Sequence, residues 1–201
     1  MVELIKERIP NTLVITLTSL LIALVLGMIV GIVSAVKQYS ILDYIFMVLA
    51  LIGVSMPIFW LGLMLVLVFS VNLGWLPVSG VGTWKHYVLP VISVAIGPIA
   101  MITRMTRSSM LEVIRQDYIR TARAKGLSER QVIWKHALKN ALIPVITVVG
   151  MQIGMIMAGS VVVEAIFNIP GLGSLMMTAI NNKDYPVIQG SVLFISLFVS
   201  L

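Results

Sequence analysis

Few side chains in this sequence could carry out catalysis, and their positions do not assemble an active site. An enzyme embedded in a membrane needs paired aspartates, or a serine with a histidine, at membrane depth, whereas Asp43, Asp117 and Asp184 are all expected in loops. His86 and His136 are expected in loops on opposite sides of a membrane, so they cannot share one metal ion. The sequence also has no cysteine and no glycine-rich phosphate-binding loop with a lysine. We therefore predict no catalytic residue, no metal ion and no bound cofactor in this chain, which is not itself an enzyme.

The most distinctive polar segment lies between residues 104 and 140 and is rich in cations. It is interrupted near its middle by Gly126. Ahead of this glycine, the stretch from Met110 to Lys125 favours a helix with cations in its last turn, and glycine suits the left-handed conformation that ends a helix. The segment holds 9 of the 14 lysines and arginines of the chain: Arg104, Arg107, Arg115, Arg120, Arg123, Lys125, Arg130, Lys135 and Lys139.

A second helix is predicted directly after Gly126. Ser128 and Gln131 have the spacing of a capping box, and Leu127 can pack against Val132 as a hydrophobic staple around it. The apolar residues that follow share one broad face, so the helix is amphipathic. A basic amphipathic helix can lie on anionic lipid. Spacing alone leaves that alternative open beside a role in contacting another protein.

The elements that must position this segment are long apolar helices. The mean hydropathy is +1.06, and 59% of the residues are hydrophobic while only 11% are charged, against about 25% charged in soluble proteins. A hydrocarbon core about 30 Å thick needs about 20 apolar residues in helix. We therefore predict an all-α membrane protein, a polytopic transmembrane helical bundle that forms one domain over residues 1–201. The candidate spans are Thr12 to Val36, Tyr44 to Val71, Val88 to Thr103, Ala141 to Val163 and a shorter block, Val187 to Leu201.

Small residues and proline mark special positions in these spans. Gly27 and Gly31 lie four apart in the first span, and Gly150 and Gly154 lie four apart in the fourth, which is the spacing that lets two membrane helices approach closely. In the second span Pro57 removes a backbone donor, so a kink is expected there. Between the second and third spans, residues 72–87 are rich in glycine and aromatic residues and are predicted to form a loop.

The distribution of cations predicts the orientation, because short loops rich in lysine and arginine stay in the cytoplasm. Residues 104–140 and Lys37 then lie inside, with 10 of the 14 basic residues. The other four basic residues face outward: Lys6, Arg8, Lys85 and Lys183. A chain that starts outside suggests a preceding span, and the short fifth block suggests that its last span continues. The net charge of +6 does not indicate nucleic-acid binding, which needs a basic patch with aromatic residues on a soluble module.

The run from Tyr118 to Leu127, followed by His136 to Pro144, resembles the cytoplasmic coupling segment of ABC importer permeases. The general pattern of that segment is Glu-Ala-Ala, three residues, Gly, nine residues and then Ile-x-Leu-Pro. Here the matching positions are Ala122, Gly126 and Leu138. The resemblance points to the dipeptide, oligopeptide and nickel group of these permeases.

The departures from the general pattern are also informative. Arg120 and Thr121 stand where Glu and Ala are usual, His136 replaces Ile, and Lys139 replaces Pro. These departures themselves resemble the peptide-type group. A second stretch, Glu164 to Gly173 continued by 182–190, is similar to the outer loop of the same group. The two stretches are far apart, and with the matching order of spans the resemblance covers nearly the whole chain.

The resemblance implies the permease subunit of a type I ABC importer in a prokaryotic plasma membrane. It implies a second, homologous permease subunit, cytoplasmic ATP-binding subunits that hydrolyse ATP, an extracytoplasmic solute-binding protein and surrounding membrane lipid as partners. Peptides are the first expected substrate. A nickel or glutathione importer of the same group, and a channel or lipid-surface protein outside the ABC class, remain alternatives. The residues that this implies for contact with the ATPase are Arg120, Thr121, Ala122, Arg123, Ala124, Lys125, Gly126, Leu127 and Ser128.

Three residues are candidates for the translocation pathway. Ser55 and Pro57 interrupt the second span, and Gln152 is a lone polar residue in the fourth. A polar group at this depth lines a cavity or bridges two helices, and the sequence leaves both open for Gln152. Glu164, at the end of the fourth span, is expected to cap a loop rather than to bind substrate.

Overall fold

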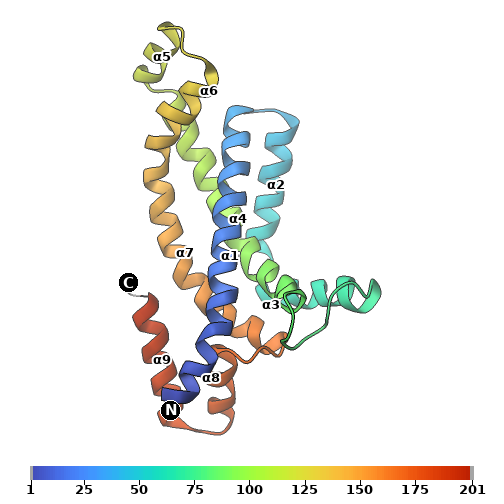
Figure 1. Cartoon of the computed structure of the whole chain (residues 1–201). Helices are drawn as coiled ribbons and strands as arrows, with labels where there is room; N and C mark the ends of the chain where they lie inside the picture. Colours follow the sequence, from blue (N-terminus) through green and yellow to red (C-terminus); the bar gives the residue numbers. More distant parts are fainter. Residues whose placement is uncertain (1, 200–201) are drawn as a thin grey trace. The chain divides into compact units, whose positions relative to one another are not determined.

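The computed structural model describes residues 2–199, and every regular element in that range is a helix. This confirms the predicted all-α class. Two of the helical stretches, η1 and η2, have the wider π-helical hydrogen-bond pattern. In chain order the elements are α1 (Val2–Val36), α2 (Ile41–Ser55), α3 (Ile58–Leu65), η1 (Val66–Asn72), α4 (Lys85–Ile114), α5 (Asp117–Ala124), α6 (Glu129–Gln131), η2 (Val132–Ala137), α7 (Leu138–Ile166), α8 (Leu172–Asn181) and α9 (Tyr185–Val199) (Figure 1).

Within the described residues, three helical stretches are long and apolar enough to cross a membrane: Glu3–Val36, Lys85–Ile114 and Glu129–Ile166. The pair formed by α2 and the α3–η1 stretch would be a fourth crossing if the broken pair spans as one. The helices α8 and α9 are apolar but shorter. The fifth predicted block corresponds to α9, and residues 200 and 201 of that block lie outside the described residues.

The long helices extend beyond the uncharged blocks from which they were predicted. Helix α1 begins about ten residues before Thr12, and α4 runs past the predicted end at Thr103 to Ile114. Lysine, arginine and glutamate are good helix formers, so a charged residue ends the membrane-embedded part of a helix without ending the helix.

The second predicted span is two separate helices rather than one kinked helix. Helix α2 ends at Ser55, and Pro57 takes an extended conformation (φ −62°, ψ 133°) as the residue that precedes α3. Proline disfavours a helical conformation in the residue before it, and it has no N–H to continue the ladder. The chain therefore breaks here. The loop predicted for 72–87 is present as irregular structure over residues 73–84.

The chain forms two compact units, each built from parts of several helices. Unit 1 comprises residues 1–21, 56–96 and 152–201, and unit 2 comprises residues 22–55 and 97–151. The helices α1, α4 and α7 each contribute to both units.

Unit 2 has two apolar clusters. The first joins Ile32 and Ala35 of α1 and Met110 of α4 to the helices α5, η2 and α7. The second joins Ala23, Ile102, Val145 and Val148. Close approach of α1 to α4 depends on glycine, because a Cβ at Gly31 would lie 2.6 Å from the Cβ of Thr106 and one at Gly27 would lie 2.8 Å from Ile102. The first predicted glycine pair is therefore a helix contact. The second is different, since a Cβ at Gly150 would meet no atom within 4 Å.

Unit 1 is organised around a buried carboxylate. The side chain of Glu164 is fully buried. It accepts hydrogen bonds from the Thr12 hydroxyl at 2.6 Å and from the N–H groups of Gly173 at 2.7 Å and Ser174 at 3.1 Å. The N–H of Leu172 in turn donates to the Thr12 oxygen at 2.8 Å. The expected capping role of Glu164 is thus found, but what it caps is the first turn of a helix, α8, within the stretch predicted as an outer loop.

Candidate functional site

The segment between α4 and α7 folds into two short helices around Gly126, and we call residues 117–131 the α5–α6 turn. The sequence predicted one helix from Met110 to Lys125, but α4 ends at Ile114 and α5 begins at Asp117. The reason is tertiary. The break redirects the chain so that Ile119 and Ala122 are buried in the first apolar cluster of unit 2.

Helix α5 ends in a Schellman motif centred on Gly126. This glycine has φ +78°, in the left-handed region that was predicted for it. The N–H of Leu127 donates to the carbonyl oxygen of Ala122 at 3.4 Å, and the N–H of Gly126 donates to that of Arg123 at 2.9 Å. These are the two bonds that define the motif, and Leu127 packs against the same apolar cluster as Ala122.

Helix α6 begins with the predicted capping box. The Ser128 hydroxyl oxygen accepts a hydrogen bond from the N–H of Gln131 at 3.4 Å, and the Gln131 side-chain oxygen accepts one from the N–H of Ser128 at 3.3 Å. Val132 is fully buried in the cluster that Leu127 contacts. From Glu129 the chain is helical without a break through η2 and α7 to Ile166. The turn is therefore joined directly to a candidate membrane span.

An ion pair closes the α5–α6 turn from the outside. Arg123 donates from Nε to Oε1 of Glu129 at 2.7 Å and from Nη2 to Oε2 at 3.2 Å. The side chains are 39% and 62% exposed, so the pair adds geometric definition more than stability. The hydrogen bond to Glu129 raises the pKa of Arg123, which keeps the guanidinium charged.

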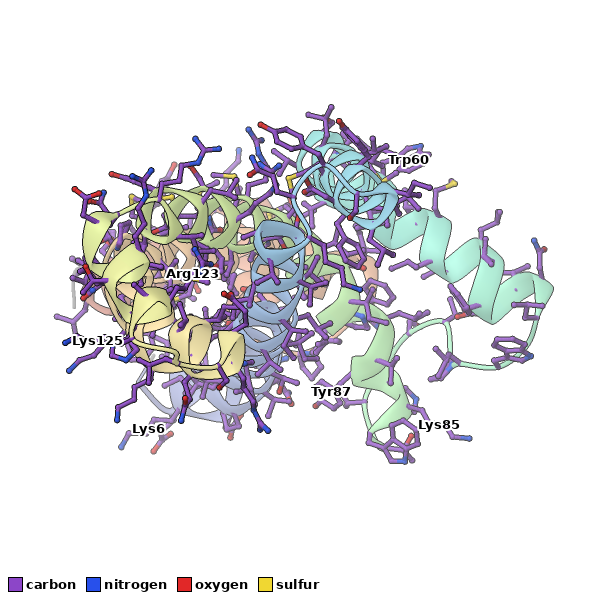
Figure 2. The ribbon with its side chains drawn as sticks, turned by 90° about the horizontal axis from the view of Figure 1, so that it is seen from above. Lys6, Trp60, Lys85, Tyr87, Arg123 and Lys125 are labelled. Carbon is purple, nitrogen blue, oxygen red and sulfur yellow. The ribbon has the colours of Figure 1, made fainter. Side chains whose placement is uncertain are left out.

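The remaining residues predicted to contact another protein lie on the exposed side of the turn. Arg120 is 74% exposed and lies 3.6 Å from the Asp117 carboxylate. The Thr121 hydroxyl donates to the carbonyl oxygen of Asp117 at 3.0 Å. Lys125 is exposed and points away from the helices, whereas Arg123 lies over them (Figure 2). Of the nine predicted residues, Ala122 is the buried one, and Leu127 is half-buried.

The three predicted pathway residues have different surroundings. Ser55 is exposed and donates a hydrogen bond to the carbonyl oxygen of Leu51 in its own helix, at 2.8 Å. Pro57 is exposed and precedes α3. Gln152 is only 7% exposed. Ser55 belongs to unit 2, and Pro57 and Gln152 belong to unit 1.

The sequence analysis missed one polar site. Asp43 was expected in a loop, but it is 1% exposed in the first turn of α2 and forms an ion pair with Arg107. A short-range signal for its position was available. Ser40 and Asp43 have the spacing of a helix N-terminus, and the Ser40 hydroxyl oxygen accepts a hydrogen bond from the N–H of Asp43 at 3.3 Å. Asp117 likewise starts a helix, α5. Over the described residues 2–199, no three side chains of His, Cys, Asp or Glu are grouped closely enough to hold a metal ion.

Comparison with known proteins shows what kind of chain carries this turn. A family model described as "Binding-protein-dependent transport system inner membrane component" matches residues 27–201. The chain belongs to this family. Its relatives include the di/tripeptide transport system permease protein DppB of Pseudomonas aeruginosa, which is 44% identical over 96% of this chain and 66% of its own length. The glutathione transport system permease protein GsiC of Escherichia coli K12 is 47% identical over 96% of this chain and 63% of its own length.

This member of the family spans about two thirds or less of the length of these curated relatives, 66% for DppB and 63% for GsiC. Its fold is that of ABC importer permeases. A permease chain in an inward-facing structure of the MetNI methionine ABC transporter matches with a TM-score of 0.78 at 21% identity, covering 100% of this chain and 91% of that one. A chain of an amino acid ABC transporter crystallised with histidines matches with a TM-score of 0.69 at 14% identity, covering 99% of this chain and 94% of that one.

Proposed function

We propose that this protein is a membrane-spanning permease subunit of an ATP-driven importer that carries di- or oligopeptides across a prokaryotic inner membrane. Membership of the binding-protein-dependent transport family supports the role in import. The name of the DppB relative supports peptides as the substrate class. Because the sequence has no phosphate-binding loop, the ATP is hydrolysed by a partner subunit.

The observation that carries the proposal is the construction of the α5–α6 turn. A Schellman motif, a capping box and a bidentate ion pair define its shape, and the predicted contact residues apart from Ala122 and Leu127 are exposed on it. Such a turn suits insertion into a groove of a cytoplasmic ATP-binding subunit, because a short rigid element transmits displacement whereas a flexible loop does not. We assign the contact to residues Arg120 to Ser128.

The orientation proposed for the chain follows the cations. Segment 104–140 lies in the cytoplasm together with Lys37, and Lys6, Arg8, Lys85 and Lys183 face the other side. In this orientation α8 and the buried Glu164 lie towards the extracytoplasmic side, where a solute-binding protein delivers the substrate.

The importer needs a second, homologous permease subunit to complete the pathway. Gly150 leaves one face of α7 open, because a Cβ at that position would meet no atom within 4 Å, and its small size suits close approach of a helix from outside this chain. Ser55, Pro57 and Gln152 are our candidates for the pathway, of which Ser55 and Pro57 are exposed and therefore available to line it.

Glutathione is a second candidate substrate because GsiC is 47% identical to this chain. Glutathione is itself a short peptide, so both candidates belong to one chemical class. The assembled transporter with its solute-binding protein distinguishes them: dipeptides should stimulate its ATPase more strongly than glutathione does. Stimulation by glutathione alone would assign the second substrate instead.

A cross-linking experiment tests the proposed contact with the ATPase. Ser128 caps α6, so a cysteine there would remove the cap; Lys125 is exposed, and Lys125→Cys leaves both caps in place. The chain has no native cysteine, which makes this position the unique thiol in the permease. We expect Lys125→Cys to be bridged to a protein whose peptides include a phosphate-binding loop, and the matched control Lys85→Cys not to be. Free aqueous labelling of Lys125→Cys without capture of an ATPase would reject the contact and favour a channel or lipid-surface role.

A further inference from the structure

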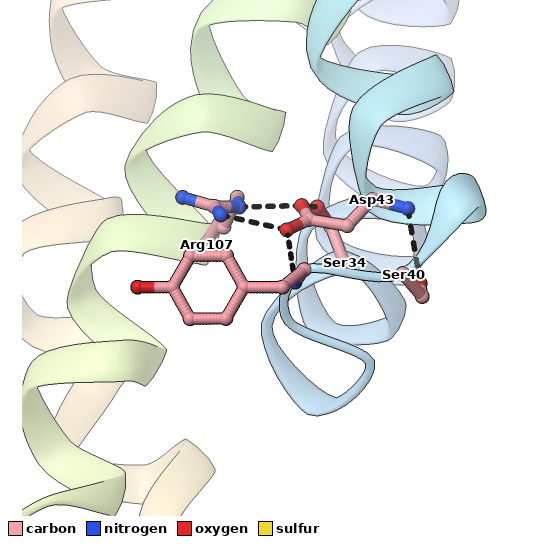
Figure 3. Close-up of polar contacts among 5 residues, drawn as sticks. Ser34, Ser40, Asp43 and Arg107 are labelled. Atoms are coloured by element: carbon pink, nitrogen blue, oxygen red, sulfur yellow. Dashed lines mark hydrogen bonds and ion pairs between the residues drawn. The ribbon is translucent and has the colours of Figure 1, made fainter.

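A buried carboxylate near the end of α1 receives hydrogen bonds from three separate parts of unit 2. Asp43 accepts from Nε of Arg107 at 2.7 Å and from Nη2 of the same guanidinium at 2.8 Å. The Ser34 hydroxyl donates to its Oδ1, and the N–H of Tyr39 donates to its Oδ2 at 3.0 Å (Figure 3). Four donors thus satisfy a carboxylate that is 1% exposed, which is the condition under which a charge is stable away from water.

Asp43 also fixes the conformation of the tight turn between α1 and α2. Tyr39 has φ +64°, a left-handed conformation that is uncommon for a residue other than glycine. The hydrogen bond from its N–H to Asp43 holds this conformation in place. The N–H of Asp43 donates to the Ser40 hydroxyl oxygen. Consequently the end of α1, the turn and the start of α2 are held by one side chain.

Arg107 connects this turn to the helix that carries the α5–α6 turn. It lies about two helical turns before the end of α4 at Ile114. On the far side of α4, the Ser109 hydroxyl donates to the carbonyl oxygen of Ala141 in α7 at 2.8 Å. The Asn140 side chain donates to the Tyr118 hydroxyl in α5 at 2.7 Å. Polar contacts therefore run from the α1–α2 turn through α4 and α7 to α5.

Apolar packing alone does not fix these elements relative to one another. A cavity of about 210 Å³ lies among the end of α1, the end of α4 and the α5–α6 turn, and it is lined by Val36, Gln38, Leu111, Arg115, Arg123 and Ile133 among others. Apolar side chains next to a void can slide, whereas the planar guanidinium fork bound to both oxygens of one carboxylate resists rotation as well as separation.

We propose that the Asp43–Arg107 ion pair makes the α1–α2 turn, α4 and the α5–α6 turn move as one body when the ATPase subunits close. Asp43 and Arg107 are then positioning residues for the coupling of ATP hydrolysis to transport. This inference rests on the proposed function, because the closing of a partner ATPase supplies the displacement. It adds a second point of control, in the first cytoplasmic turn, to the contact that residues 120–128 make.

A distance measurement on the assembled transporter tests the proposal without altering the ion pair. Spin labels at Lys37→Cys and Trp134→Cys, both exposed positions of unit 2, report the distance between the α1–α2 turn and the helix that follows α6. We expect the same distance distribution without nucleotide and with ATP trapped by vanadate. With Arg107→Gln added, we expect the distribution to broaden and to differ between the two states. A nucleotide-dependent shift with Arg107 intact, or no difference on adding Arg107→Gln, would overturn the proposal.

Transport assays separate this role from general stability. In Asp43→Asn and Arg107→Gln we expect uptake to fall about tenfold or more, because each leaves a buried group without its partner, while basal ATPase activity and co-purification with the ATPase are kept. Arg107→Lys retains the charge without the fork and should be intermediate. The exposed carboxylate of Glu7 provides the control, and Glu7→Gln should transport normally.

The two levels of the argument fail in different ways. If the unmodified chain does not co-purify with an ATPase, the proposed function is wrong. If it does, and Asp43→Asn transports normally, only the role of the ion pair is wrong. If a variant does not assemble, the spin-label distances measured with the ion pair intact still decide the question, because a shift between nucleotide states contradicts movement as one body.

Discussion

The Thr12 hydroxyl donates a 2.6 Å hydrogen bond to the buried carboxylate of Glu164, 152 residues further along the chain. The same threonine oxygen accepts the N–H of Leu172, and the other carboxylate oxygen accepts the N–H groups of Gly173 and Ser174. Three helices of unit 1, α1, α7 and α8, therefore meet at two side chains. A helix N-terminus has four N–H groups without intrahelical partners, and here a side chain from another helix satisfies several of them.

Thr12→Val should release α8 from α1 with little change in side-chain volume. The substitution leaves a buried carboxylate oxygen and the N–H of Leu172 without a partner, at a cost of about 1–3 kcal/mol. We expect a lower thermal midpoint in detergent and faster proteolysis between residues 168 and 184. Thr18→Val is the control, because Thr18 is exposed on the same helix. Equal effects of the two substitutions would show that the Thr12 contact is not what holds α8.

Gly31→Ala should separate α1 from α4. The added Cβ would lie 2.7 Å from the carbonyl oxygen of Thr103 and 2.6 Å from the Cβ of Thr106, so the helices must move apart. Overpacking of this kind costs about 1–3 kcal/mol, and we expect the thermal midpoint in nanodiscs to fall. At Gly97 a Cβ would meet no atom within 4 Å, so Gly97→Ala should be neutral or slightly stabilising through its better helix propensity. A stable Gly31→Ala protein would contradict the close approach.

Gly126→Pro should leave the chain inserted in the membrane but uncouple uptake from ATP hydrolysis. The native φ of +78° is outside the range that proline can adopt, and proline would also remove the N–H that bonds to Arg123. Uptake into proteoliposomes and ATPase activity, measured on the same preparation, check the expectation. Gly126→Asn is the matched variant, because asparagine tolerates the left-handed conformation, and it should retain most of the uptake. Uptake at the unmodified level by Gly126→Pro would contradict the coupling role of the turn.

Cysteine accessibility should reveal the proposed orientation. A membrane-impermeant thiol reagent applied to intact cells should label Lys85→Cys and Lys183→Cys but not Lys37→Cys or Lys125→Cys, because the cation-rich loops stay inside. In inside-out vesicles the pattern should reverse. The absence of native cysteine removes background labelling from this chain. Labelling of Lys125→Cys from outside would invert the topology and exclude contact with a cytoplasmic ATPase.

The α5–α6 turn could be predicted from sequence because its determinants are local. Gly126, Ser128 and Gln131 lie within six residues, and the capping bonds that they form depend on little else. The break after Ile114 could not be predicted in the same way. It depends on burial of Ile119 and Ala122 against residues of α1 and α7, which are distant in the chain.

The Asp43 site shows the same division between local and distant information. The spacing from Ser40 to Asp43 indicates a helix start, but the partner that keeps Asp43 buried is Arg107, 64 residues away. Cations at the edge of a span are ordinary, so nothing local distinguishes Arg107 from Arg104. Similarly, the spacing of Gly27 and Gly31 matches that of Gly150 and Gly154, yet only the structure shows that Gly31 has a neighbour and Gly150 has none within this chain.

The unbroken helix from α6 into α7 restricts how sequences of this kind can change in length. One extra residue between Leu138 and Met151 would turn everything before it by about 100° and shift it by about 1.5 Å along the axis. The α5–α6 turn would then face a different direction, although none of its own residues had changed. The irregular stretch 73–84 has no such constraint. Insertions and deletions should therefore accumulate there during evolution, and an engineer adding a tag or a sensor domain should choose that stretch rather than α7.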